Sequence, residues 1–364
     1  MNDYLRSTAP ASRNGFEIAI LCALPLEREA VLLLLDDLWD GKGSNRHRYA
    51  RAKGDFNTYT HGRIGRFNVV IVLLDTMGKV PAAGAATAVR IGYPNISLAL
   101  IVGICAGVPF PKKSQGVILG DIVISNILIH RDFGRQLSNR FEIRNSIEDV
   151  PGRPNRDIRS LLRSLEGGGR FEVEEQAAHY LQQLQQKNDA DPRLARGRYE
   201  YPGAENDRLF ESSYEHRHHY TSWDYGCCAQ GFICKESREI ECEELGCDVN
   251  YIIPRKRLSQ SSNQRLPPPP QIHIGPMGSG DSVIRSAQHR DFLAVEGVIG
   301  IEMEGAGAWD ELPSIVIKGV CDYADSHKSK MWQHYAAATA ASVAKAVLDE
   351  YPGSGRVSRD AHSP

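Results

Sequence analysis

The sequence predicts an α/β fold in which buried strands alternate with helices. Apolar runs at residues 16–23, 98–102 and 316–321 have the length and continuous hydrophobicity of buried strands. Helical patterns follow the first and the last of these runs. Asp322 stands at the carboxyl end of the last run, where open α/β sheets place the groups that bind ligands. We therefore expect a ligand site at this edge of the sheet.

The composition is that of a globular protein and argues against several classes of function. Of 364 residues, 41% are hydrophobic and 24% charged, with a net charge of −2, so nothing favours nucleic acid or an anionic membrane as a partner. No uninterrupted apolar stretch reaches the roughly 18 residues of a transmembrane helix, and no signal peptide is apparent. The eight cysteines do not form a disulfide framework, and Cys22, Cys105 and Cys321 lie in apolar runs. A cytoplasmic protein with reduced thiols is expected.

One domain is predicted over residues 16–351, between a flexible N-terminus at 1–15 and a flexible tail at 352–364. Pro25 suits the first turn of the helix that follows the first strand, and Gly65-Arg66 suits a hairpin turn. The predicted elements are a strand at 16–23, a helix at 25–35, hairpin strands at 59–64 and 67–74, a helix at 81–91, strands at 98–102 and 119–125, helices at 156–165 and 173–184, strands at 272–276 and 316–322, and a helix at 331–350.

Residues 186–270 are polar and interrupt this alternation. They are predicted to be an insertion with little regular structure, and a loop this long should be functional, oligomeric or disordered. A histidine cluster lies at residues 216–219. Zinc binding is an alternative, but free thiols are expected. The cysteines of the insertion are Cys227, Cys228, Cys234, Cys242 and Cys247.

Two carboxylates within the apolar stretch 300–306 mark the centre of the candidate site. Glu302 and Glu304 are two residues apart, and carboxylates are rarely buried unless they are paired or hydrogen-bonded. In an extended segment they would point to the same side, whereas at a helix start they would diverge. The alternative to a functional role is that both glutamates are exposed at the start of a helix, where the helix dipole favours acidic residues. The strand that ends at Asp322 favours a functional role.

Seven short motifs follow one another along the chain, and their order indicates a relationship to known proteins more specifically than any single motif does. They are Ala23-Leu24-Pro25-Leu26-Glu27, Met77-Gly78-Lys79-Val80, residues 103–107, Gly120-Asp121, Ser279-Gly280-Asp281, Glu302-Met303-Glu304-Gly305 and Cys321-Asp322-Tyr323-Ala324-Asp325. Together they resemble the purine nucleoside phosphorylase / methylthioadenosine–adenosylhomocysteine nucleosidase superfamily, over about residues 16–135 and 272–350. The middle of the chain resembles the fungal branch, whose domains often head larger immune-receptor-like chains. The resemblance implies a three-layer αβα sandwich with a central mixed, partly closed β-sheet.

The resemblance also implies cleavage of a nucleoside's N-glycosidic bond at ribose C1′ through an oxocarbenium-like transition state. Asp322 would be the acid at purine N7, although capping a turn is its alternative role. Glu304 would hold the ribose hydroxyls and Met303 would pack beneath the sugar. The other residues expected to bind the substrate are Cys105, Ala106, Gly107, Glu302, Trp332 and, beside the purine, Val283 and Ile284.

The resemblance leaves open which aromatic side chain would contact the substrate. Val283 lacks the stacking face that bacterial nucleosidases often have at this position, so Tyr201 or Phe210 of the insertion is a candidate to supply it. Trp332 is expected to close over the 5′ end of the sugar, with a place in the core as its alternative.

Glu27 decides between water and phosphate as the nucleophile. Hexameric phosphorylases have an arginine in the segment that contains Glu27, and an arginine and a serine near Ile101 and Ile104. A phosphate dianion needs N–H and cationic donors, which a carboxylate and two isoleucines do not supply. Nucleosidases have a glutamate here that deprotonates water, so the resemblance implies hydrolysis, with Glu27 as base and Asp322 as acid.

Other classes of function remain as alternatives. A phosphorylase would bind phosphate through Arg28, Arg63 or a neighbouring subunit's arginine, and a sensor would bind a nucleoside without cleaving it. The expected partner is a small-molecule purine nucleoside of the adenosine type. A homo-oligomer, a dimer or higher, is implied by the resemblance alone. Nucleic acid, membrane, metal and organic cofactors are not expected.

Overall fold

The computed structural model describes residues 8–40, 49–111, 116–138, 141–144, 152–219, 233–261 and 269–353. Most of the predicted flexible ends, and both Cys227 and Cys228, lie outside these ranges. Within residues 8–15 the chain contacts the domain, because the Tyr49 hydroxyl donates a hydrogen bond of 2.6 Å to the Pro10 carbonyl.

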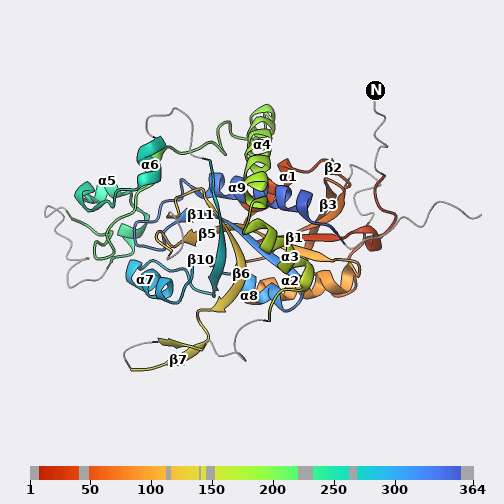
Figure 1. Cartoon of the computed structure of the whole chain (residues 1–364), viewed down its shortest axis with the longest axis horizontal. Helices are drawn as coiled ribbons and strands as arrows, with labels where there is room; N and C mark the ends of the chain where they lie inside the picture. The colour runs from red at the N-terminus through yellow and green to blue at the C-terminus, as the bar shows by residue number, and fades with distance from the viewer. Residues whose placement is uncertain are drawn as a thin grey trace, which may run out of the picture.

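The strands and helices alternate as the sequence predicts (Figure 1). The strands are β1 (Ile18–Cys22), β2 (Asp37–Leu38), β3 (Thr58–Ile64), β4 (Phe67–Leu73), β5 (Leu98–Gly107), β6 (Ile122–His130), β7 (Gly134–Gln136), β8 (Phe141–Ile143), β9 (Ile272–Ser279), β10 (Gly300–Glu302) and β11 (Ser314–Asp322). The α-helices are α1 (Pro25–Leu33), α2 (Lys79–Gly92), α3 (Arg156–Leu165), α4 (Gly169–Ala190), α5 (Cys242–Leu245), α6 (Lys256–Ser261), α7 (Ala287–Val295), α8 (Gly305–Trp309) and α9 (Gln333–Glu350).

Nine strands form one mixed sheet that is partly closed. Its order is β10-β9-β6-β11-β5-β1-β4-β3-β2, and β10 pairs in addition with β5. The five strands from β10 to β5 therefore form a closed barrel, and the remaining strands continue as an open sheet. β1 runs parallel to β4 and β5, whereas β11 is parallel to β5 and antiparallel to β6. The predicted mixed, partly closed sheet is confirmed.

Helices cover both faces of the sheet. In Figure 1, α1, α9 and α4 lie on one side, and α2 and α8 lie on the other. α9 packs on β11 and β5, with α4 outside it, and its alanine-rich stretch is buried almost throughout. Gly319 of β11 makes this approach possible, because a Cβ there would lie 1.9 Å from the Ala336 carbonyl oxygen. These layers confirm the predicted αβα sandwich.

The structure differs from the sequence prediction in the length of β5. We predicted a strand that ends at residue 102, followed by a cap of small residues, but β5 continues to Gly107. Its second half pairs with β11 on one side and with β10 on the other. The added strand pairing holds the small residues extended, and it brings Cys105 and Ala106 beside Asp322 and β10.

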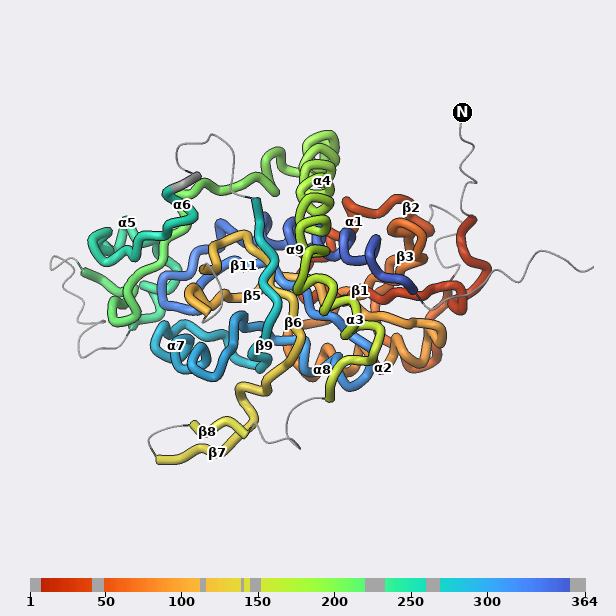
Figure 2. The backbone as a smooth tube through the Cα atoms, in the orientation of Figure 1, coloured from red at the N-terminus to blue at the C-terminus, as the bar shows by residue number. Residues whose placement is uncertain are grey.

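The described part of the 186–270 insertion consists of loops and short helices, apart from the end of α4, which reaches Ala190. The insertion is anchored by buried Leu209 and Phe210, and Phe210 forms a β-bridge with Ile252. Figure 2 shows α5 and α6 at the opposite end of the molecule from the N-terminus, and the β7–β8 ribbon projecting from the body.

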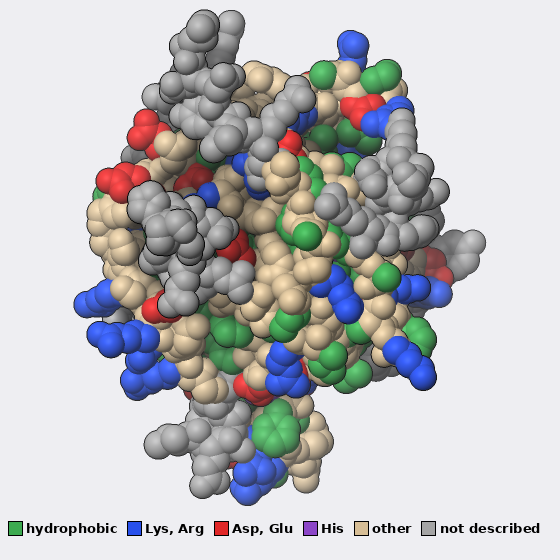
Figure 3. Space-filling model, turned by 90° about the vertical axis from the view of Figure 1, so that its right-hand side faces the viewer, with side chains coloured by type: hydrophobic (Ala, Val, Ile, Leu, Met, Phe, Trp, Pro, Cys, Tyr) green, Lys and Arg blue, Asp and Glu red, His purple; other side chains and the backbone are tan. Residues whose placement is uncertain are grey.

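The described surface carries interspersed charges. On the face in Figure 3, acidic and basic side chains alternate with apolar ones. Among the described residues, none of the helices combines the length and the apolar character needed to cross a bilayer.

Candidate active site

A cavity of about 490 Å³ lies where β1, β5, β10 and β11 end. Nine of the eleven residues that the sequence proposed line it together. These nine are Glu27, Cys105, Ala106, Val283, Ile284, Glu302, Met303, Glu304 and Asp322. Segments more than 290 residues apart along the chain therefore contribute to one cavity, as the positions of Glu27 and Asp322 show.

Glu27 is held rigidly at the start of α1. Its Oε2 accepts hydrogen bonds from the backbone N–H groups of Ala23 (2.8 Å) and Leu24 (2.9 Å), and its Oε1 accepts one from Ile104 (2.8 Å). Leu24 is the residue before the helix and has no side-chain acceptor, so Glu27 reaches back and satisfies the helix start. The side chain is 1% exposed, and this burial raises its pKa. A raised pKa suits a carboxylate that takes a proton near neutral pH.

Gly103 makes room for the Glu27 carboxylate. A Cβ at position 103 would lie 2.1 Å from Oε1 of Glu27 and 2.5 Å from its carboxyl carbon. The next residue, Ile104, supplies the N–H that binds Oε1. Glycine therefore allows β5 to approach Glu27 closely enough to hydrogen-bond it.

Glu302 and Glu304 are both buried but have different partners. Glu302 ends β10, and its Oε2 accepts hydrogen bonds from the N–H groups of Glu304 (2.9 Å) and Gly305 (2.8 Å), which caps α8. Glu304 instead accepts a hydrogen bond of 2.8 Å from Nζ of Lys318. Their exposed fractions of 3% and 5% rule out the exposed helix start.

Lys318 is a functional candidate that the sequence analysis missed. It is 1% exposed, and its ammonium lies 4.0 Å from Glu302 as well as 2.8 Å from Glu304. Burial alone would lower the pKa of Lys318, but Glu304, Glu27 and Glu302 together raise it. The available signal was a lysine inside the apolar run 316–321, because a lysine is rarely buried without a partner.

Asp322 lies at the end of β11. One of its carboxylate oxygens has two strong partners, and the other has only a weak hydrogen-bond donor. Its Oδ1 accepts a hydrogen bond from the Ala324 N–H (2.8 Å) and pairs with Nζ of Lys328 (2.9 Å). Its Oδ2 has the Cys321 thiol at 3.5 Å, and a thiol is a weak donor. Oδ2 is therefore the oxygen available to a ligand, while Lys328 is a second cation that the sequence analysis did not identify.

The part of the cavity expected to hold the base is aliphatic. Val283 and Ile284 line it, but among the described lining residues none is aromatic. Tyr201 packs against Trp332 and Tyr335, and Phe210 stacks on His327 at 3.9 Å. Neither of them lines this cavity, and the insertion contributes residues 238–241 instead.

Trp332 and Gly107 do not line the main cavity. Trp332 is 1% exposed and its indole N–H donates a hydrogen bond to the Asn206 carbonyl, so it lies in the core, which was the alternative that the sequence analysis gave. It borders a smaller pocket of about 80 Å³ on the other side of Asp322. The Cβ that Gly107 lacks would lie 2.6 Å from Val320, which indicates a packing role.

Comparisons with known proteins identify one relative in sequence. No family model matches the chain. A nucleotide-binding leucine-rich repeat (NLR)-like protein of Hyaloscypha variabilis is 30% identical over 340 residues, which cover 92% of this chain and 29% of that protein. This chain thus spans less than a third of the length of that relative, which agrees with the predicted likeness to the fungal, receptor-associated branch.

Solved structures of nucleosidases share the fold. A 5′-methylthioadenosine/S-adenosylhomocysteine nucleosidase of Neisseria meningitidis, in complex with methylthio-immucillin-A, has a TM-score of 0.50 at 14% identity, covering 94% of this chain and 100% of that one. Futalosine hydrolase of Helicobacter pylori has a TM-score of 0.51 at 14% identity, covering 92% and 98%. The chain therefore has the nucleoside phosphorylase/nucleosidase fold that its motifs predicted.

Proposed function

We propose that this chain is a purine nucleosidase that hydrolyses the N-glycosidic bond of adenosine-type nucleosides. The observation that carries the proposal is the convergence of Glu27, Glu304 and Asp322 on one cavity. Structures with this fold include nucleosidases with ligands of the nucleoside-analogue class, which supports a small-molecule nucleoside as the substrate.

Each carboxylate has surroundings that suit one role. Glu27 is fixed by three backbone N–H groups and would take a proton from the attacking water as it adds to C1′. Glu304, which pairs with the ammonium of Lys318, would accept hydrogen bonds from the ribose hydroxyls. Asp322 would act as the acid that gives a proton to purine N7 through Oδ2 as the bond to C1′ breaks, so that the base leaves in its neutral form. The products would be free base and ribose.

Water is favoured over phosphate as the nucleophile. The arginines considered as phosphate ligands are used elsewhere: Arg28 donates to the Thr60 hydroxyl at 2.8 Å, and Arg63 pairs with Asp37. Neither lines the cavity. The negative charge of Glu27 would repel a phosphate dianion, and the apolar side chain of the buried Ile101 offers it no donor. Phosphorolysis remains the competing activity and a non-cleaving sensor the competing class.

One experiment separates these functions. Base release is measured from adenosine, inosine, guanosine and methylthioadenosine, each with and without phosphate, for the wild type and Glu27→Gln. Glu29→Gln is the matched control, because Glu29 lies on the same helix but pairs with Arg198 and does not line the cavity. Phosphate-independent release that is lost only in Glu27→Gln supports hydrolysis. Strict phosphate dependence would show a phosphorylase, and binding without release would show a sensor.

A further inference from the structure

Three side chains of the insertion converge outside the proposed active site. His216, Cys242 and Cys247 place one potential ligand atom each within 4.8 Å of one another. Nδ1 of His216 lies 3.5 Å from both sulfur atoms. A tetrahedral zinc ion with Zn–S of about 2.3 Å and Zn–N of about 2.0–2.1 Å holds its sulfur and nitrogen ligands roughly 3.5 Å apart. The distances from Nδ1 of His216 to the two sulfur atoms are thus those of a tetrahedral zinc site.

His216 is oriented as a ligand by its other nitrogen. Nε2 lies 2.9 Å from the Ile240 carbonyl oxygen, which can only accept a hydrogen bond. Nε2 therefore carries the proton, and the lone pair of Nδ1 faces the sulfurs. The ring is 4% exposed, and the backbone N–H of His216 donates to the Ser326 hydroxyl at 3.0 Å. Metal-binding histidines commonly have such a carbonyl partner.

The two cysteines are brought together by a tight turn. Cys242 begins α5, and the Cys247 N–H donates to the Cys242 carbonyl at 2.9 Å. Gly246 has a positive φ of 73°, which ends the helix and reverses the chain. The cysteines are separated by four residues, at the upper end of the usual spacing in zinc sites. The sequence analysis favoured free thiols because the cysteines of the insertion do not form the paired knuckles that are usual in structural zinc sites.

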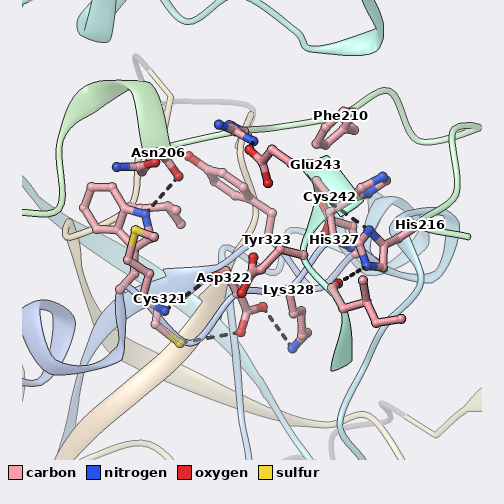
Figure 4. A pocket seen from close by; sticks show the side chains of 18 residues that line it. Asn206, Phe210, His216, Cys242, Glu243, Cys321, Asp322, Tyr323, His327 and Lys328 are labelled. Carbon is pink, nitrogen blue, oxygen red and sulfur yellow. Dashed lines mark hydrogen bonds and ion pairs between the residues drawn. The ribbon is translucent and has the colours of Figure 1, made fainter. Parts of the chain in front are cut away.

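We propose that His216, Cys242 and Cys247 bind a zinc ion that fixes one wall of the main cavity. The residues just before Cys242, at positions 238–241, line that cavity, and the carbonyl of Ile240 is the partner of His216. His216 and Cys242 also border the small pocket beside Asp322 (Figure 4). That pocket has room for a water as the fourth ligand, and the ion would bind the cysteines as thiolates after their protons leave.

Metal analysis of the purified full chain tests this proposal without an activity assay. We expect about one zinc per chain, and loss of the metal in Cys242→Ser, Cys247→Ser and His216→Ala. Cys234→Ser is the matched control, because its sulfur lies 3.7 Å from His218 and outside the three-residue group; it should retain the metal. Chelation should lower the melting temperature of the wild type and of Cys234→Ser.

Cobalt replacement keeps the proposal testable if a variant fails to fold. Cobalt added to the chelated wild-type protein should produce the thiolate-to-metal absorption of a tetrahedral site, and zinc should abolish it. A wild-type chain that binds neither ion stoichiometrically would overturn the proposal. A disulfide between Cys242 and Cys247 in the native protein, detected by mass spectrometry, would also overturn it. Neither result would affect the proposed hydrolysis at Glu27.

Discussion

Nζ of Lys318 lies 2.8 Å from Oε2 of Glu304, and both groups are buried beneath the cavity. Removing one member of such a pair leaves an uncompensated charge. Lys318→Met should therefore lower the free energy of unfolding by about 3–5 kcal/mol. The raised pKa of Lys318 means that this stability is complete below its ordinary value of 10.5 and is lost only at higher pH.

Denaturant unfolding of the single variants and of Lys318→Met/Glu304→Gln tests this coupling. The double variant should recover part of the loss, because it removes both charges together. Strictly additive losses would show that the two side chains do not stabilise each other.

Glu27→Gln should reduce base release by roughly 10²–10⁴-fold, the usual contribution of a general base. Burial raises the pKa of Glu27 above its ordinary 4.5, and only the ionised carboxylate can accept the proton. Release by the wild type should therefore rise with pH, with a midpoint above 4.5. A pH–rate profile checks this, and the acid limb should be absent from the residual activity of Glu27→Gln. If Glu27→Gln keeps the acid limb of the pH–rate profile, that limb reports the titration of another group.

Gly103→Ala should reduce base release although residue 103 carries no functional group. The added Cβ would lie 2.1 Å from Glu27 Oε1, so the carboxylate or β5 must move. Gly84→Ala on α2 is the control, because a Cβ there meets nothing within 4 Å and alanine is the better helix former by about 1 kcal/mol. Initial rates and melting temperatures of both variants give the comparison. Full activity in Gly103→Ala would mean that the position of Glu27 is not critical.

Asp121 should contribute stability that disappears in acid. Its buried carboxylate pairs with Arg257 and with His273, whose Nε2 lies 2.9 Å away. Burial alone would raise the pKa of Asp121, but His273 and Arg257 lower it below 3.8. The contribution is therefore complete above pH 3.8 and is lost as pH falls through the lowered pKa.

Unfolding curves between neutral and acidic pH measure this effect. Asp121→Asn should be less stable near neutral pH and should lose less stability in acid than the wild type. Glu175→Gln, at an exposed position of α4, should follow the wild type. Parallel curves for Asp121→Asn and the wild type would exclude Asp121 as a source of acid sensitivity.

The sequence predicted most of the fold because its strands and helices have strong local patterns. α3 coincides with the predicted helix at 156–165, and the ordered motifs indicated a partly closed sheet. The extension of β5 to Gly107 was not predictable from local pattern, because it depends on pairing with β10, almost 200 residues away. Local sequence also does not reveal that Lys318 faces Glu304.

The site was predictable where motifs mark strand ends and less so elsewhere. Nine proposed residues share the cavity, although their roles stay predictions. The sequence left two positions open for Trp332, because its place in the core follows from packing on Tyr201 and Tyr335. The contribution of residues 238–241 could not be foreseen, since the path of a long insertion depends on tertiary contacts.

The pairing of β10 with both β9 and β5 has a consequence for self-association. A strand that has neighbours on both sides offers no unsatisfied backbone groups to another chain. Within the nine-stranded sheet the free edge is β2, which is two residues long and carries a charged side chain. The barrel side of this sheet is therefore closed to strand addition, and among the described strands such pairing stays open only at the β2 side of the sheet and at the β7–β8 ribbon.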